Sequence, residues 1–297
     1  MRIGLLLNSV LSPVMLSEGA CPSRNNLISL TTTALFTGVF SDTKQALRDK
    51  YGLPVPSYWA PMIPVFLLLL ATMSPSPSSP YTSNVVITSQ HIKRDYVPDG
   101  DLNSGVWRLV PHVSFDHNYT GDKRYPELKT EVASLWSDKY VYFAFWCKYQ
   151  HINTYQGEDA GKERWGLWER DVVEVFLNPQ PDEVSHYYEF EVAPNNQWID
   201  LEINLDKEPF NSAAWNSGFE HAVRVDEKQH LWMCEMRIPL SALKAHLTPN
   251  SEWRGNFYRA EGTGTDEQRS LLAWSTVVAK PEAFHNPSRF GIIRFAP

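Results

Sequence analysis

The chain has 297 residues, which is enough for about two ordinary domains or for one large β domain with additional segments. Charged residues make up 21% of the sequence and hydrophobic residues 43%, a balance typical of globular proteins. The net charge of −7 argues against nucleic-acid binding, and no apolar run reaches the roughly 20 residues that span a bilayer. Three cysteines are too few for a disulfide scaffold or a four-cysteine zinc site.

Residues 1–80 are predicted to be a disordered N-terminal leader. They hold nine of the 21 prolines and only one of the eleven tryptophans. The apolar run from Met62 to Met73 is followed by the Pro/Ser-rich residues 74–80, an order typical of a secretory signal and its linker. This order indicates an extracellular or periplasmic protein. A leader with an incidental apolar run is the alternative, because no Lys or Arg follows Met62 in the run.

From residue 82 to 297 the apolar residues recur with a spacing of two, which predicts β-strands. A hairpin turn is expected at 137–139 and a short helix at 241–246, after Pro239. Many short strands with one or two short helices predict an all-β domain, an antiparallel β-sandwich of immunoglobulin-like or jelly-roll-like type. In chain order, the expected strands are 131–136, 140–147, 171–177, 187–193, 197–205, 231–238, 253–259 and 290–295.

Two of these strands, 187–193 and 197–205, are expected to form a hairpin. The first strand has Tyr188, Phe190 and Val192 on its apolar side, and the second has Ile199, Leu201, Ile203 and Leu205. Pairing Ala193 with Trp198 places the two apolar sets on the same face, whereas a shift by one residue mixes them. We therefore expect the register that pairs these two residues.

That register gathers four carboxylates on the other face of the hairpin. It places Glu191 opposite Asp200, and Glu189 opposite Glu202. Like charges directly opposite each other are destabilising, so a bound cation, a ligand rich in hydroxyl donors or neighbouring arginines should offset them. The carboxylates are therefore candidate ligand-binding residues. The alternative is a solvated face with partners such as Arg237 or Arg259.

Several segments, in order, resemble the family 9 carbohydrate-binding modules, which are related to DOMON-type sandwiches. The resemblance covers 82–297, and it is carried by 98–107, which holds the pattern D-G-x-L before Trp107, and by 168–179, 187–192, 235–243, 253–259 and 273–276. It implies a β-sandwich that binds sugars between two aromatic rings. It therefore implies a non-catalytic protein that recognises an oligosaccharide or polysaccharide during carbohydrate catabolism, as family modules often accompany glycoside hydrolases.

The resemblance also implies individual binding residues. In the family a tryptophan that clamps the sugar precedes a sugar-binding glutamate by six positions, and Trp168 and Glu174 reproduce that spacing. Glu174 is an acid within an apolar strand, which is unusual without a function. Trp274 is the candidate for the second ring, although Leu271 stands where the family has asparagine. Trp274 in the core, with Phe284 as the second ring, is the alternative.

Two other functions compete with carbohydrate binding. A glycoside hydrolase acting on O-glycosyl bonds needs two carboxylates about 5–5.5 Å or about 6.5–9.5 Å apart, and nearly any cross-strand pair meets the first distance. A haem-binding redox module of related fold would need His or Met ligands such as Met233 or Met236, but no C-x-x-C-H motif is present. No cofactor is expected apart from a structural calcium ion, which the family can bind through oxygen ligands. The acidic loop candidates for it are Asp99, Asp101, Glu158 and Asp159.

Cys147 and Cys234 lie in predicted strands and alternate with apolar or aromatic neighbours. No Cys–His pattern accompanies them, so buried, unreactive thiols are expected rather than a nucleophile. Export would permit a disulfide between them. The sequence does not indicate an oligomeric state.

Overall fold

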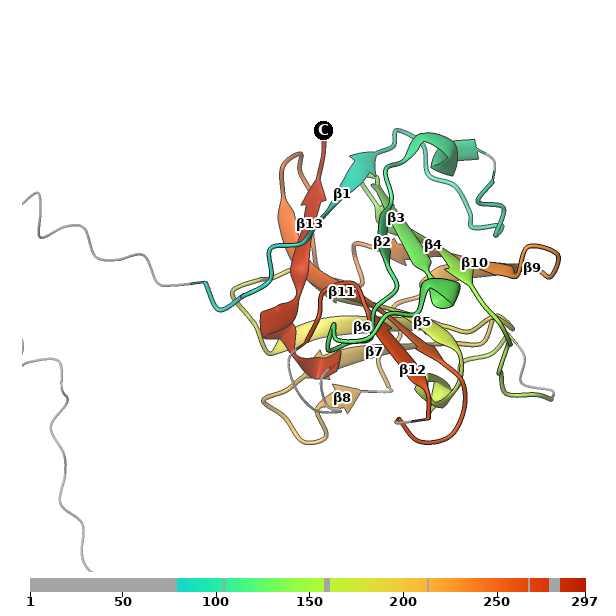
Figure 1. Cartoon of the computed structure of the whole chain (residues 1–297). Helices are drawn as coiled ribbons and strands as arrows, with labels where there is room; N and C mark the ends of the chain where they lie inside the picture. Colours follow the sequence, from blue (N-terminus) through green and yellow to red (C-terminus); the bar gives the residue numbers. More distant parts are fainter. Residues whose placement is uncertain (1–78, 104, 158–160, 213, 267, 278–283) are drawn as a thin grey trace, which may run out of the picture. The chain divides into compact units, whose positions relative to one another are not determined.

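The computed structural model describes residues 79–297, apart from residues 104, 158–160, 213, 267 and 278–283 (Figure 1). The chain divides into two units, Met1–Pro77 and Ser78–Pro297, and the described residues belong to the second. The predicted leader and its apolar run therefore lie almost entirely outside the described residues. Within the described part, no helix has the length and apolar character needed to cross a membrane.

The described domain is built almost wholly from β-strands. Its strands are β1 (Val86–His91), β2 (Val113–Phe115), β3 (Thr130–Trp136), β4 (Tyr140–Lys148), β5 (Val172–Asn178), β6 (His186–Val192), β7 (Trp198–Asn204), β8 (Asn211–Ser212), β9 (Glu220–Asp226), β10 (Leu231–Pro239), β11 (Glu252–Glu261), β12 (Ser270–Ala273) and β13 (Gly291–Phe295). The helical elements of the described residues are 3-10 helices of three to five residues: η2 (Gly105–Leu109), η3 (Pro126–Leu128), η4 (Leu167–Glu169) and η6 (Pro287–Arg289).

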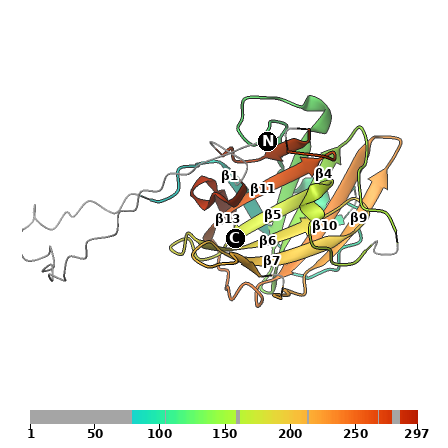
Figure 2. The same cartoon turned by 90° about the horizontal axis from the view of Figure 1, so that it is seen from below.

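The strands form a sandwich of two sheets. One sheet has the order β8-β7-β6-β5-β11-β13, and the other has the order β3-β4-β10-β9. Strand β1 joins the two, because its first residues pair with β13 and its last two with β3. Neighbouring strands are antiparallel except at β1, which is parallel to both of its partners. Figure 2 shows β11, β5, β6 and β7 side by side in the first sheet.

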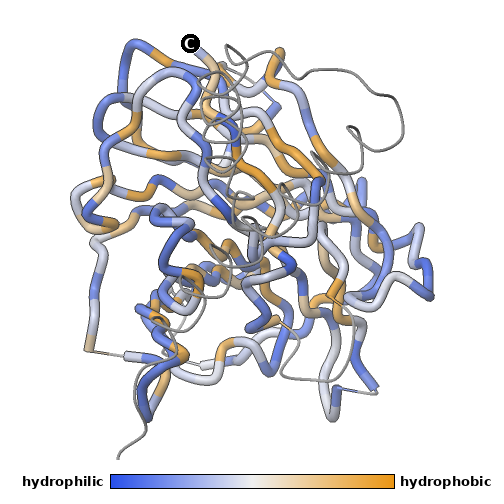
Figure 3. The backbone as a smooth tube through the Cα atoms, turned by 90° about the vertical axis from the view of Figure 1, so that its left-hand side faces the viewer, coloured by the Kyte–Doolittle hydropathy of each residue, from blue (hydrophilic) through white to orange (hydrophobic). Residues whose placement is uncertain are grey.

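A hydrophobic core fills the space between the sheets because alternate side chains of each strand point inward. Phe143 and Phe145 of β4 meet Phe257 of β11 there, with ring centroids 5.4 Å and 6.0 Å apart. Apolar segments run along the strands, whereas many connections between them are hydrophilic (Figure 3). Each sheet also carries a smaller apolar cluster on its outer face, one around Phe176 and Tyr258 and the other around Trp107 and Tyr142. The predicted β-sandwich is therefore confirmed.

All eight predicted strands are present, and so is the turn after Trp136. The predicted helix at 241–246 is wrong. The segment forms successive turns, in which the Ala242 amide donates to the Pro239 carbonyl oxygen and the Lys244 amide to that of Ser241. The left-handed backbone of Lys244, with φ of +51°, prevents these turns from continuing as a helix. Five strands had not been predicted, namely β1, β2, β8, β9 and β12.

The predicted register of the β6–β7 hairpin is also wrong, by one residue. Val192, not Ala193, pairs with Trp198, so that Glu191 lies opposite Ile199 and Glu189 opposite Leu201. The cause is the loop. The Ala193 amide donates to the Gln197 carbonyl oxygen, which leaves a three-residue connection that ends at Asn196 in the left-handed conformation (φ +67°).

This shift places the four carboxylates of the hairpin on two faces. Glu189 and Glu191 share the outer face with Leu201 and Ile199, whereas Asp200 and Glu202 lie on the other face. Asp200 is anchored there by the backbone amide of Ser217, which donates to its Oδ2 at 2.7 Å. Glu202 contacts His186, with 2.9 Å between Oε1 and Nε2. Both faces of this hairpin are largely buried, so the simple contrast between an apolar and a polar face does not apply.

Candidate functional site

Three glutamates meet on the outer face of the first sheet. Glu174 lies on β5 and pairs with Glu191 on β6, two residues away from Glu189. The next strand, β11, places Tyr258 beside Glu174. One carboxylate oxygen from each glutamate lies within 4.8 Å of the other two. The sandwich thus concentrates three acidic groups in one small region.

The glutamate cluster, Glu174, Glu189 and Glu191, is almost completely buried. The three residues are 2%, 4% and 0% exposed. Neither carboxylate oxygen of Glu191 has a hydrogen-bond partner, and Glu189 Oε2 also has none. Burial without hydrogen-bond donors disfavours the charged form of an acid. It raises the pKa of Glu174 and of Glu191 well above the ordinary value, and the charge of a neighbouring glutamate of the cluster raises each pKa further.

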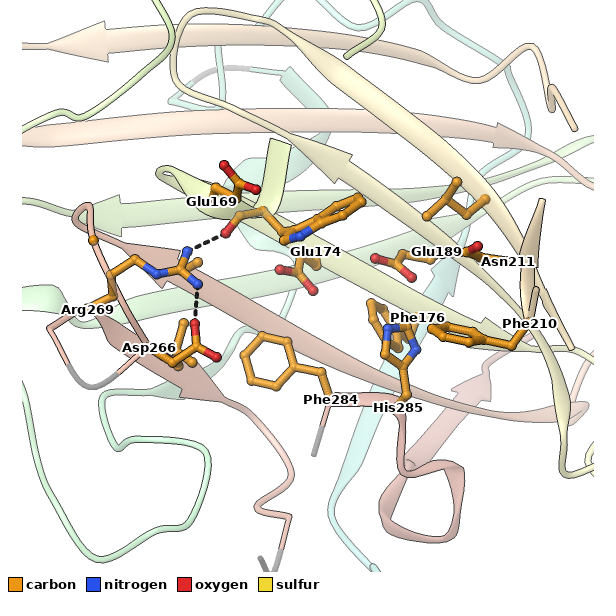
Figure 4. A pocket seen from close by; sticks show the side chains of 15 residues that line it. Glu169, Glu174, Phe176, Glu189, Phe210, Asn211, Asp266, Arg269, Phe284 and His285 are labelled. Carbon is orange, nitrogen blue, oxygen red and sulfur yellow. Dashed lines mark hydrogen bonds and ion pairs between the residues drawn. The ribbon is translucent and has the colours of Figure 1, made fainter. Parts of the chain in front are cut away.

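A cavity of about 470 Å³ lies directly over this cluster (Figure 4). The carboxylates of Glu174 and Glu189 point into it between two sets of aromatic side chains. A volume of this size and a lining that mixes apolar rings with a few polar groups are typical of small-ligand sites. The cavity is lined by Trp168, Glu169, Glu174, Phe176, Glu189, Leu201, Phe210, Asn211, Ala260, Gly264, Asp266, Arg269, Leu271, Phe284 and His285.

One wall of the cavity is formed by Trp168. This residue belongs to the short helix η4, which follows Gly166, a residue in the left-handed conformation with φ of +77°. Its carbonyl oxygen accepts a hydrogen bond from Arg269 Nη1, and Arg269 Nη2 forms an ion pair with Asp266. The ring of Trp165 packs edge-on against Trp168, with centroids 5.1 Å apart, and is 55% exposed. An aromatic surface therefore extends from the cavity to the solvent.

The opposite wall is formed by Phe284 and His285. The ring of Phe284 stacks on Tyr258 with centroids 4.1 Å apart, and the Tyr258 hydroxyl donates to the Phe284 carbonyl oxygen at 3.0 Å. His285 Nδ1 is hydrogen-bonded to the Tyr187 hydroxyl at 2.7 Å. The hydroxyl groups of Tyr258 and Tyr187 on the sheet thus anchor this segment by hydrogen bonds.

Trp274 does not line the cavity. It is 7% exposed and belongs to the core between the sheets, where its ring lies 5.1 Å from that of Phe257. Strand pairing explains its position: Ala273 lies opposite Tyr258 and shares its outer face, so the next side chain points inward. The prediction that Trp274 is the second ring of the site is therefore wrong in position. The alternative residue, Phe284, does line the cavity.

The structure thus brings together Trp168, Glu174, Glu189 and Glu191 and separates Asp200, Glu202 and Trp274 from them. Sequence reasoning missed the residues that loops and short strands contribute to the lining. Arg269 and His285 are examples, and they lie 95 and 111 positions after Glu174 in the chain. No spacing pattern connects them with β5. Only the preference of buried arginine for carboxylates and carbonyl oxygens gave a general indication.

The opening motif at 98–107 has a structural role on the other sheet. The Trp107 Nε1 donates to Glu235 Oε1 at 2.7 Å, and the amides of Asp99 and Gly100 donate to Glu235 Oε2 at 3.0 Å and 3.2 Å. The motif therefore closes around one buried carboxylate of β10.

The residues considered for calcium or haem do not form a site within the described part of the chain. The carboxylate of Asp99 accepts the amide of Asp101, and the Asp101 carboxylate pairs with Arg224 at 3.3 Å; Glu158 and Asp159 lie outside the described residues. Met233 and Met236 belong to separate clusters on opposite faces of β10. Structural calcium stays a prediction. The glutamate cluster is the one group with spacing suited to a metal ion that the described residues contain.

Cys147 and Cys234 are both free and buried in the core between the sheets. Burial raises the pKa of the Cys147 thiol to about 12 and that of Cys234 well above its ordinary value. Both thiols are thus protonated at neutral pH and lack the thiolate character of a nucleophile.

Comparison with known proteins identifies related domains. The family described as carbohydrate family 9 binding domain-like matches residues 98–296. A relative from Arthroderma benhamiae, named extracellular protein, is 25% identical over 200 residues, which make up 64% of this chain and 86% of the relative.

Two solved structures share the fold at low sequence identity. A candidate carbohydrate-binding protein from Bacteroides uniformis has a TM-score of 0.57 at 18% identity, and the match covers 72% of this chain and 100% of that one. A family 9 carbohydrate-binding module from Caldicellulosiruptor kristjanssonii, in complex with cellotriose, has a TM-score of 0.51 at 16% identity, and the match covers 71% of this chain and 94% of that one.

Proposed function

Because this chain belongs to the carbohydrate family 9 binding domain-like family, we propose that it binds a carbohydrate in the cavity between Trp168 and Phe284. The observation that carries the proposal is the combination of these two rings with the carboxylates of Glu174 and Glu189 in one cavity. A pyranose has apolar C–H faces and a rim of hydroxyl donors. Aromatic rings cover such faces, and carboxylates accept hydrogen bonds from such a rim.

The ligand is an oligosaccharide or a polysaccharide end rather than a single sugar unit. The exposed ring of Trp165 continues the aromatic surface of Trp168 beyond the cavity and offers a second stacking platform. The related family 9 module that was solved with cellotriose is consistent with a ligand of several units. The relative named extracellular protein supports a role outside the cell, and we propose that this role is polysaccharide recognition during carbohydrate catabolism.

Binding without cleavage fits the arrangement of the acids better than glycoside hydrolysis. A glycosidase places its two carboxyl groups on either side of the scissile bond, with one as acid and the other as base or nucleophile. Here Glu174, Glu189 and Glu191 all project from the same face of two adjacent strands, and their oxygens lie within 4.8 Å of one another. The other carboxylates that line the cavity are already engaged, Glu169 with the Tyr155 hydroxyl and Asp266 with Arg269.

The test is a glycan array with the full chain, followed by calorimetric titration of the best ligand and by incubation with chromogenic glycosides. The expected result is specific binding with no release of the chromophore. An array without any specific signal contradicts carbohydrate binding. Turnover that survives purification and disappears in Glu174→Gln instead identifies the protein as a glycoside hydrolase.

A further inference from the structure

We propose that the sugar bound in this cavity is an amino sugar, whose protonated amine lies against the carboxylates of Glu174 and Glu189, with Glu191 directly behind them. This inference rests on the proposed function, since an amino sugar is one class of carbohydrate. It is carried by two observations, the proximity of the three carboxylates and the buried Oε2 atom of the cavity-lining Glu189, which has no hydrogen-bond partner in the described structure.

The three acids of the glutamate cluster outnumber the permanent cations among the described residues that line the cavity. Arg269 is the one permanent cation among these residues; its Nη groups are bonded to the Trp168 carbonyl oxygen and to Asp266, and its charge opposes the burial that raises the pKa of Glu174. His285 is engaged with the Tyr187 hydroxyl. A buried carboxylate without a donor is costly unless a ligand supplies one. A ligand that suits the glutamate cluster therefore brings a positive charge and several N–H donors.

A primary ammonium group fits the spacing of the three acids. Acceptors about 2.8 Å from one ammonium nitrogen, at tetrahedral angles, lie about 4.6 Å from one another. The oxygens of the glutamate cluster lie within 4.8 Å of one another. An ammonium group in the cavity thus reaches the carboxylates of Glu174 and Glu189 through charge-assisted hydrogen bonds, while Glu191 lies directly behind them.

A metal ion fits the same spacing less well. Calcium takes 6–8 oxygen ligands, whereas the glutamate cluster offers three side chains. The carbonyl oxygens of β5 and β6 are used in the ladders of the sheet, and the neighbours of the cluster are Tyr258, Ile199 and Leu201. These side chains add no carboxylate or amide oxygen to complete a coordination shell.

The walls of the cavity explain why the amine belongs to a sugar. In an amino sugar the amine is attached directly to a ring carbon, so the apolar face and the charge lie within one pyranose unit. Trp168 and Phe284 provide surfaces for that face, while Glu174 and Glu189 reach the cavity between them. Aromatic faces also attract a nearby cation.

The experiment compares three β-1,4-linked trisaccharides that differ only at carbon 2: cellotriose with a hydroxyl, the trimer of glucosamine with an amine, and the trimer of N-acetylglucosamine with an acetamide. The full chain is titrated with each at about pH 6.5, below the pKa near 7.7 of an α-amino group, which is likewise bonded to a carbon beside an electron-withdrawing, oxygen-bearing carbon. We expect the glucosamine trimer to bind at least about tenfold more tightly than the other two.

Each alternative result has a distinct meaning. Equal or tighter binding of cellotriose or of the acetylated trimer overturns the amino-sugar inference and leaves carbohydrate binding intact. Failure of all three trimers, together with a blank glycan array, overturns both. Binding of the glucosamine trimer that EDTA abolishes and calcium restores also overturns the inference, because it assigns the carboxylates to a metal ion.

The variant Glu189→Gln keeps the shape of a side chain that lines the cavity and removes its charge. We expect it to weaken the glucosamine trimer by about 10- to 100-fold and to weaken any affinity for cellotriose less. Glu127→Gln, an exposed glutamate outside the cavity, is the matched control for net charge. Equal affinity of Glu189→Gln and Glu127→Gln for the glucosamine trimer, with both variants folded by their thermal transitions, contradicts the inference.

Discussion

Two buried glutamates on the outer faces of the two sheets have opposite environments. Glu235 of β10 accepts hydrogen bonds from the Trp107 indole and from two backbone amides. Glu191 of β6 is fully buried and accepts none. Burial alone therefore does not distinguish a structural carboxylate from one available to a ligand. The distinction lies in whether the protein supplies the donors itself.

The largest expected effect on the free energy of unfolding concerns Glu235, whose carboxylate accepts hydrogen bonds from the protein. Replacement Glu235→Ala leaves the buried Trp107 indole and the buried Gly100 amide without an acceptor, each at a cost of about 1–3 kcal/mol, and removes the partly buried bond from the Asp99 amide. We expect the free energy of unfolding to fall by about 3–5 kcal/mol, as measured by urea denaturation. A loss below about 1 kcal/mol shows instead that water replaces the carboxylate and that the opening motif is not a structural anchor.

The next effect contrasts a tryptophan of the cavity with one of the core. Trp168→Ala is expected to weaken carbohydrate binding by about 1–3 kcal/mol, by analogy with stacked bases, while changing the melting temperature little. Trp274→Ala is expected to lower the free energy of unfolding by about 3–5 kcal/mol, because its buried ring leaves a void. Calorimetry and thermal denaturation of both variants provide the measurement. Unchanged affinity in Trp168→Ala places the binding site elsewhere.

Glu191, which lacks hydrogen-bond donors, predicts that the free energy of unfolding falls as the pH rises. A carboxylate in an ordinary salt bridge has the opposite effect. Because the pKa of Glu191 is raised, the folded state keeps a proton that the unfolded state releases above about pH 4.5. Without ligand, its contribution to stability is therefore full in acid and is lost as the pH rises through the raised pKa. The loss amounts to about 1.4 kcal/mol per pH unit in that window.

The Glu191→Gln variant isolates this contribution. It should be as stable as the wild type near pH 4.5 and more stable near pH 8, because an amide does not become charged. Other shifted groups titrate in the same range, such as His221, whose pKa burial lowers to about 4, and Glu261, whose pKa burial raises to about 7. They are common to both proteins and cancel in the difference between the two unfolding curves. A difference that stays constant from pH 4.5 to 8 contradicts the raised pKa.

The smallest effect is expected from a carboxylate on the other face of the same hairpin. Glu202 has a partly exposed partner, His186, and lies away from the cavity. Glu202→Gln should change the free energy of unfolding by less than about 1 kcal/mol and leave carbohydrate affinity unchanged. A marked loss of affinity in this variant supports the register in which all four carboxylates of the hairpin share a face.

The sequence by itself determined the strands, the sandwich and one half of the site. Alternation with a period of two is a local property, and it located β3, β4, β5, β6, β7, β10, β11 and β13 within a few residues. The spacing between Trp168 and Glu174 is local as well, because a short segment joins the helix η4 to β5. The resemblance to the family added the kind of ligand that these two residues suggest.

Only the tertiary structure decided which carboxylates meet and what faces them. The alternation of apolar residues in the hairpin favoured the register that groups its two apolar sets. The loop decided otherwise, because Asn196 adopts a positive φ and the connection is one residue shorter. The same holds for the part of the cavity wall that Phe284 and His285 form. Phe284 and His285 reach Glu174 through contacts with Tyr258 and Tyr187, which are separated from them by many residues. Such contacts leave no periodic pattern in the sequence, since their geometry arises only when the sheet has formed.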